Sequence, residues 1–151
     1  MIFIGNIRDV KAGEYDEVWA IVRSWPSAGK SKWIQHVPAL SPSWKLHAEQ
    51  QAMVLNGEWN RENFETVFAP KLIDEMHRSD ARQALNSLVV KDRKGKNIAL
   101  VCFCVDEDTC HRRVIAGLLQ GAGASVYLRS RKDFSAYVDQ YTAKEKPSSG
   151  E

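Results

Sequence analysis

The chain has 151 residues, of which 26% are charged, and a formal net charge of +2, which suits one domain with a sizeable core. This mildly basic balance falls short of the dense positive surface typical of proteins that only bind nucleic acid, so such a role would have to rest on local residues. Three cysteines favour reduced thiols over a disulfide framework. No apolar stretch is long enough to span a membrane, and we expect a soluble cytoplasmic protein.

Short apolar runs predict the first strands. Residues 1–4 and 17–23 have strand character, and the turn-like segment between them barely accommodates a crossover helix, so we expect the two strands to pair as a hairpin. Residues 24–43 are rich in Trp, Ser, Lys and Pro, and they predict one long loop.

The middle of the chain is predicted to be helical. Weak helical patterning covers residues 44–55, and a clearer pattern follows Asn60, with Pro70 expected to break or kink it. Ser79 is a candidate N-cap of the next helix, which should end near Lys94-Gly95.

A strand, a polar turn and a helix follow. The apolar run 98–105 has the length of a buried strand, and helical periodicity begins just after the turn, so Asp108 or Thr109 should cap a helix over residues 110–120. Gly121-Ala-Gly123 should end this helix.

The remaining residues complete the fold. Residues 125–128 predict a strand parallel to the previous one, joined by a right-handed crossover, and a helix should follow around 134–141. We therefore expect an α/β class, a small three-layer domain over residues 1–141 with a mostly parallel sheet flanked by helices, and a flexible polar tail over 142–151.

Several reactive side chains converge where the 98–105 strand ends, and ligands gather at the carboxyl ends of parallel strands. Amides and the helix dipole at the start of the next helix favour an anion and would make the Cys110 thiol more acidic. Cys110 and His111 are the candidate catalytic residues, and Cys104 and Arg112 are candidate ligand contacts. Cys110 and His111 should lean toward the packed side, while Arg112 and Arg113 face outward.

A structural role is the alternative for each of these residues. Cysteines in an apolar strand, such as Cys102 and Cys104, are often simply core residues, and His111 can serve a helix start through hydrogen bonds alone.

Three enzyme templates can be compared with this segment. A phosphatase loop fails, because Cys110 stands where Cys104 would need an arginine. A zinc site lacks a Cys-x-x-Cys pair, and we predict neither a metal nor another cofactor. A cysteine nucleophile needs a nearby base, for which the candidates are His111, His36, His47 and His77.

A second polar cluster follows the 17–23 strand. Arg23, Ser24, Ser27 and Lys32 can donate hydrogen bonds to phosphate, and Trp25 or Trp33 could stack on a base. The alternative is a solvated loop that its tryptophans anchor to the core. If both clusters border one crevice, that crevice is cationic, and further positive charge would come from Arg129, Arg131 and Lys132.

These two segments resemble the signatures of a known family, domain of unknown function 488. The strand 98–104 with Cys110-His111-Arg112 is similar to the family's Cys-His-Arg element, and Arg23-Ser-Trp-Pro-Ser27 is similar to its second element, a strand that ends in Asp-Val-Arg. This chain has Ile21 where that pattern has the aspartate. The resemblance implies an α/β domain with a polar crevice, and it assigns no activity.

Together these observations predict a domain that binds a phosphate-bearing ligand, either a nucleotide or a nucleic-acid end, between the two clusters. In this hypothesis Arg23 and Arg112 hold the phosphate, and His111 donates a hydrogen bond or acts as a general acid or base. Whether a reaction follows is open. The alternatives are a non-catalytic module that sequesters a nucleotide and a protein-interaction domain.

Overall fold

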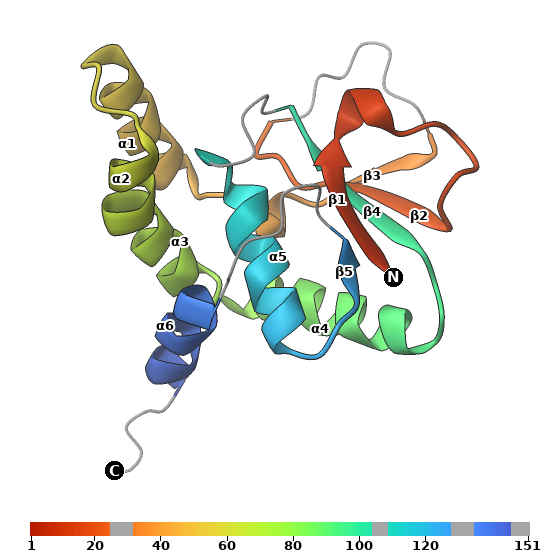
Figure 1. Ribbon diagram of the computed structural model, residues 1–151. Helices are drawn as coiled ribbons and strands as arrows, with labels where there is room; N and C mark the ends of the chain where they lie inside the picture. Colours follow the sequence, from red (N-terminus) through yellow and green to blue (C-terminus); the bar gives the residue numbers. More distant parts are fainter. Residues whose placement is uncertain (25–31, 104–108, 128–134, 146–151) are drawn as a thin grey trace.

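The computed structural model of the protein describes residues 1–24, 32–103, 109–127 and 135–145 (Figure 1). Its strands are β1 (Ile2–Asn6), β2 (Glu17–Ala20), β3 (Ile34–His36), β4 (Ile98–Cys102) and β5 (Val126–Tyr127). Its helices are α1 (Trp44–Leu55), α2 (Arg61–Asn63), α3 (Ala69–Glu75), α4 (Ser79–Arg93), α5 (His111–Gly121) and α6 (Ser135–Glu145). Two short 3₁₀ turns, η1 (Ile7–Asp9) and η2 (Pro38–Leu40), and a π-helical segment, η3 (Phe64–Phe68), complete the described elements.

The strands form one sheet in the order β3-β2-β4-β1-β5, and every pairing is parallel. The α/β class predicted from the sequence is confirmed. β4 lies between β2 and β1, and all of its residues are buried. A central parallel strand is covered on both faces, which explains why its sequence is a continuous apolar run.

The hairpin expected between the first two strands is wrong. β1 and β2 both pair with β4, which lies between them. Neighbouring strands are about 4.8 Å apart, so the connection covers about 10 Å across β4, and because the strands are parallel it also returns about 13 Å along β4, from beside Cys102 to beside Ile98. Residues 7–16 cross that distance with η1 and a turn, and no crossover helix is needed.

The single long loop expected over residues 24–43 is also wrong in part. β3 and η2 lie within it, and β3 pairs with β2 at the edge of the sheet. β3 is short, and its Gln35 and His36 are exposed, so it lacks the apolar alternation by which a strand is recognised in a sequence.

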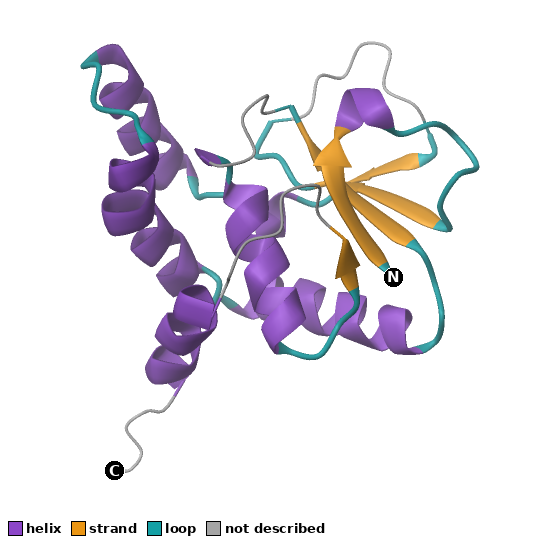
Figure 2. Cartoon of the chain, viewed as in Figure 1, coloured by secondary structure: helices purple, strands orange, loops and turns teal. Residues whose placement is uncertain are grey.

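Two clusters of apolar side chains pack against the sheet. Ile4 and Leu100 belong to the larger one, together with Leu46 of α1 and residues of α3, α4, α5 and α6. Val18 and Val101 belong to the smaller one, against which Ile7 and Tyr15 pack. The helices thus cover one face of the sheet, and the short segment after β1 covers the other (Figure 2). Within the described ranges, no helix is long and apolar enough to cross a membrane.

The segment from α1 to α3 forms a helical arm beside α5 (Figure 1). Ser43 caps α1 by accepting a hydrogen bond from the Leu46 amide at 3.1 Å. The α-helical ladder changes to the π-helical η3 just before Pro70, which then occupies the first turn of α3. The backbone stays helical from η3 into α3, and the π-helical turn accommodates a residue that cannot donate a hydrogen bond.

Several helix boundaries differ from the sequence expectations. Ser79 is the first residue of α4 and not its N-cap, a position that Arg78 takes. Cys110 is the N-cap of α5 in place of Thr109, and Asp108 lies outside the described residues. Gly123, with φ of 95°, ends the α5 turn as expected, because glycine adopts this left-handed conformation without strain. α6 continues to Glu145, into the segment that was expected to be a tail.

Candidate binding site at the carboxyl edge of the sheet

Helix α5 begins beside the end of β4. Its N-cap residue, Cys110, has extended backbone angles and makes no cap hydrogen bond, whereas Ser43 caps α1 and Asn60 caps α2. The Cys110 side chain therefore does not satisfy the amides of the first turn. Such amides, together with the positive end of the helix dipole, attract an anion.

His111 joins the start of α5 to the end of β2. Its Nε2 lies 2.5 Å from the Ile21 carbonyl oxygen, and because a carbonyl can only accept, Nε2 is the donor. In the neutral imidazole, Nδ1 is then an acceptor, and it lies 3.7 Å from the Cys110 Sγ. The geometry is that of a thiol beside a base that a third group orients.

A second thiol adjoins this pair. The Sγ of Cys102, at the end of β4, lies 3.2 Å from the Sγ of Cys110. Both cysteines are 1% exposed, and neither is in a disulfide. The two thiols and the imidazole form a continuous row of polar atoms from β4 through α5 to β2.

Arg23 anchors a turn beside this row. Its Nε donates to the Pro42 carbonyl at 2.8 Å, and its Nη2 donates to the carbonyls of Pro38 and Ser41 at 3.0 and 3.3 Å. Burial lowers the pKa of Arg23 from its ordinary value, and the nearby Arg78 adds to this effect. The guanidinium thus holds the turn around η2 against the end of β2.

The structure brings the two sequence clusters together at this edge. Ile21, whose carbonyl accepts from His111, precedes Arg23 by two positions. Its side chain is fully buried in the core, so no carboxylate stands where the family pattern has one. His36 bonds the next carbonyl, that of Val22, at 2.8 Å.

The expectation that Arg112 and Arg113 face outward is wrong. Arg112 is 1% exposed and Arg113 is 5% exposed. The helical arm and α6 pack over the side of α5 that a two-layer arrangement would leave open, so every residue from His111 to Leu119 is buried. The sequence of α5 alone carries no sign of this cover.

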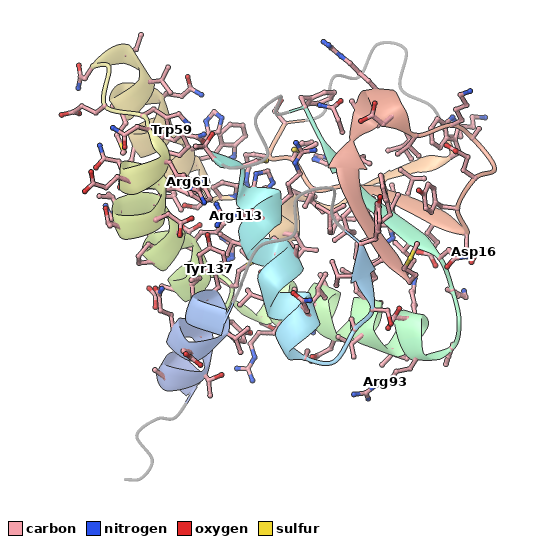
Figure 3. The ribbon with its side chains drawn as sticks, in the orientation of Figure 1. Asp16, Trp59, Arg61, Arg93, Arg113 and Tyr137 are labelled. Atoms are coloured by element: carbon pink, nitrogen blue, oxygen red, sulfur yellow. The ribbon has the colours of Figure 1, made fainter. Side chains whose placement is uncertain are left out.

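Arg113 takes part in a network that sequence reasoning missed. Its Nη1 lies 3.2 Å from Glu65 Oε1, and its guanidinium lies 5.9 Å from the centre of the Tyr137 ring (Figure 3). The Tyr137 hydroxyl donates to Glu65 at 2.5 Å, and burial with this bond raises the pKa of Tyr137 well above its ordinary value. These residues lie on three separate helical segments, so no local pattern could reveal them.

The other predicted site residues are less central. Ser24 and Lys32 are exposed at the borders of the described residues. His77 bonds the Tyr141 carbonyl at 3.1 Å and so serves the α3–α6 contact. Ser27 and Cys104 lie outside the described residues, as do Trp25, Arg129, Arg131 and Lys132.

Other features in the described part of the chain do not point to a different centre. A groove between α4, α5 and α6 is lined by Leu85, Leu118 and Tyr141, and it lies toward the C-terminal end of α5, the end opposite Cys110. Among the residues that the structure describes, no three His, Cys, Asp or Glu side chains are grouped so that they could hold a metal ion.

Comparison with known proteins identifies the family of this chain. The family model DUF488-N3a, described as the active DUF488-N3 subclade, matches residues 4–123. No curated protein and no solved structure matches the chain. The matched range includes both signature segments and the helices between them, so the resemblance inferred from those segments is confirmed.

Proposed function

Since the chain belongs to the active DUF488-N3 subclade of the DUF488 family, we propose that it binds a phosphate-bearing ligand where α5 begins and β2 ends. The ligand class is a nucleotide or a nucleic-acid end. The observation that carries this proposal is the position of the start of α5, which the bond from His111 to Ile21 holds against the end of β2. Both features lie at the carboxyl edge of a parallel sheet, where α/β proteins bind their ligands.

In this proposal each residue of the site has a separate role. Amides of the first α5 turn bind phosphate oxygens, and the nearby Arg112 adds positive charge. His111 has its Nε2–H engaged by Ile21, so Nδ1 is the atom that exchanges a proton with the Cys110 thiol. Arg23 fixes the turn that borders the site.

Binding without turnover is the second candidate function. Ile21 places an apolar side chain, fully buried, where the family pattern has an aspartate. A reaction that relied on that carboxylate would be lost, while the amides and Arg112 would still bind the ligand. The word "active" in the family description favours turnover, so the experiment has to measure both.

The test is a thermal-shift screen with inorganic phosphate, pyrophosphate and a panel of nucleoside mono-, di- and triphosphates. A ligand at roughly 100 times its dissociation constant stabilises the fold by about 2.7 kcal/mol, which raises the melting temperature of a domain of this size by about 5–10 °C. Mass spectrometry of the incubated ligand then separates turnover from storage.

The matched control replaces a histidine outside the site. His111→Gln should reduce the thermal shift, whereas His77→Gln, at the contact between α3 and α6, should leave the shift unchanged. If no phosphate compound raises the melting temperature of the wild-type protein, or if both variants respond alike, the proposed site is wrong.

A further inference from the structure

We propose that Cys102 and Cys110 are a redox-sensitive pair that a small hydroperoxide, such as hydrogen peroxide, converts into a disulfide. Their sulfur atoms lie 3.2 Å apart, so small side-chain rotations bring them to bonding distance. The pair consists of two thiols on separate elements, the end of β4 and the start of α5. Its oxidation does not depend on the ligand proposed above.

The surroundings assign a different part to each thiol. Cys110 lies at the start of a helix, where amides and the dipole stabilise a thiolate, and His111 Nδ1 is 3.7 Å from its sulfur. The bond from His111 Nε2 to Ile21 keeps Nδ1 as the acceptor. Cys110 is therefore the sulfur that attacks, and Cys102 is the sulfur that resolves the product.

The chemistry balances in two steps. The Cys110 proton moves to His111 Nδ1, and the thiolate attacks one peroxide oxygen, which breaks the O–O bond and gives a sulfenic acid and hydroxide; hydroxide takes the proton from His111 and leaves as water. The Cys102 thiol then attacks the Cys110 sulfur, the S–O bond breaks, and a second water forms. The two sulfurs lose two electrons in all, and the peroxide gains them.

Burial restricts the oxidant. Each cysteine is 1% exposed, so a water-sized hydroperoxide reaches the sulfurs more readily than a bulky disulfide does. The neighbouring thiol also protects Cys110, because a sulfenic acid that meets a thiol at once does not proceed to the irreversible sulfinic acid.

The experiment counts thiols in the full chain after exposure to hydrogen peroxide. Cys104→Ala leaves Cys102 and Cys110 as the only cysteines, because the chain has three. Intact mass spectrometry after alkylation in denaturant should show both thiols lost together, with two hydrogens removed from the mass, and both regained after treatment with dithiothreitol. If both thiols stay reactive, or if the bond links two copies of the chain, the proposal is overturned.

Two further variants separate the parts. In Cys102→Ala no intramolecular disulfide should form, and Cys110 should instead gain oxygen atoms; a Cys104–Cys110 bond formed at the wild-type rate would contradict the assignment of Cys102. In His111→Gln the disulfide should form roughly a hundredfold more slowly, and an unchanged rate would remove His111 from the mechanism. Circular dichroism and the melting temperature confirm that each variant is folded before it is oxidised.

Discussion

Replacing Arg23 with alanine tests whether its guanidinium holds the protein or the ligand. The structure gives it short hydrogen bonds to Pro42 and Pro38, and a longer one of 3.3 Å to Ser41. A hydrogen bond from a charged donor contributes about 1.5 kcal/mol at the low end of the measured range. Counting only the two short bonds, Arg23→Ala should lower the free energy of unfolding by about 3 kcal/mol, a large part of the 5–15 kcal/mol typical of a domain.

Urea unfolding followed by tryptophan fluorescence measures this loss. Arg23→Lys should recover part of the stability, because one ammonium reaches fewer carbonyls than the guanidinium fork does. Arg93→Ala is the control, since Arg93 is exposed at the end of α4 (Figure 3) and should change stability by about 0.5 kcal/mol or less. A loss below about 1 kcal/mol in Arg23→Ala, with ligand binding abolished, would refute the anchoring role and favour direct contact with the phosphate.

Three further changes have definite expected outcomes. Glu65→Gln should destabilise the fold by about 2 kcal/mol, because the Arg113 side chain is only 6% exposed and loses its carboxylate partner. The loss is smaller than that for a fully buried ion pair because Glu65 is one-third exposed. Urea unfolding measures this loss. Gly121→Ala should lower the free energy of unfolding by about 1–3 kcal/mol and loosen α6, since a Cβ at this position collides with Val138. Limited proteolysis should then cleave α6 faster, and an unchanged cleavage rate would disprove the close approach of α5 and α6. Burial alone would raise the pKa of Glu17, but bonds from Lys91 and Trp19 and the charges of Lys91 and Lys96 lower it below its usual value. Its contribution is therefore present above about pH 5 and lost as pH falls, so the stability difference between wild type and Glu17→Gln should shrink on acidification, and a constant difference from pH 7 to pH 3 would contradict this.

The parts of the fold that the sequence predicts correctly are those with local signals. The apolar run that begins at Ile98 gives β4, the periodicity after Cys110 gives α5, and Gly123 gives the stop. The order of the strands is a non-local property, and the hairpin prediction failed because nothing between residues 7 and 16 indicates that β4 inserts there. β3 was not predicted from the sequence because this short edge strand has little apolar surface.

In the candidate site, too, the residues with a local sequence signal were predicted and those that depend on the folded chain were not. Cys110 and His111 stand out in the sequence by their place at a strand-to-helix junction, and the structure adds the bond to Ile21 that fixes the imidazole. The burial of Arg112 depends on the arm that covers α5, which no feature of the α5 sequence reveals. Glu65 and Tyr137 were missed because they meet only in the folded chain.

The most direct test of the proposed ligand site is an NMR titration of the ¹⁵N-labelled protein with pyrophosphate. We predict saturable shifts of the His111 and Arg112 amides at the start of α5, with smaller changes elsewhere in the described chain. The basic end of α4, with Lys91, Lys94 and Lys96, serves as an internal comparison because it would attract any polyanion weakly. Shifts confined to that end of α4, or no saturable shift at the start of α5, would contradict the claim that this helix start is the ligand site.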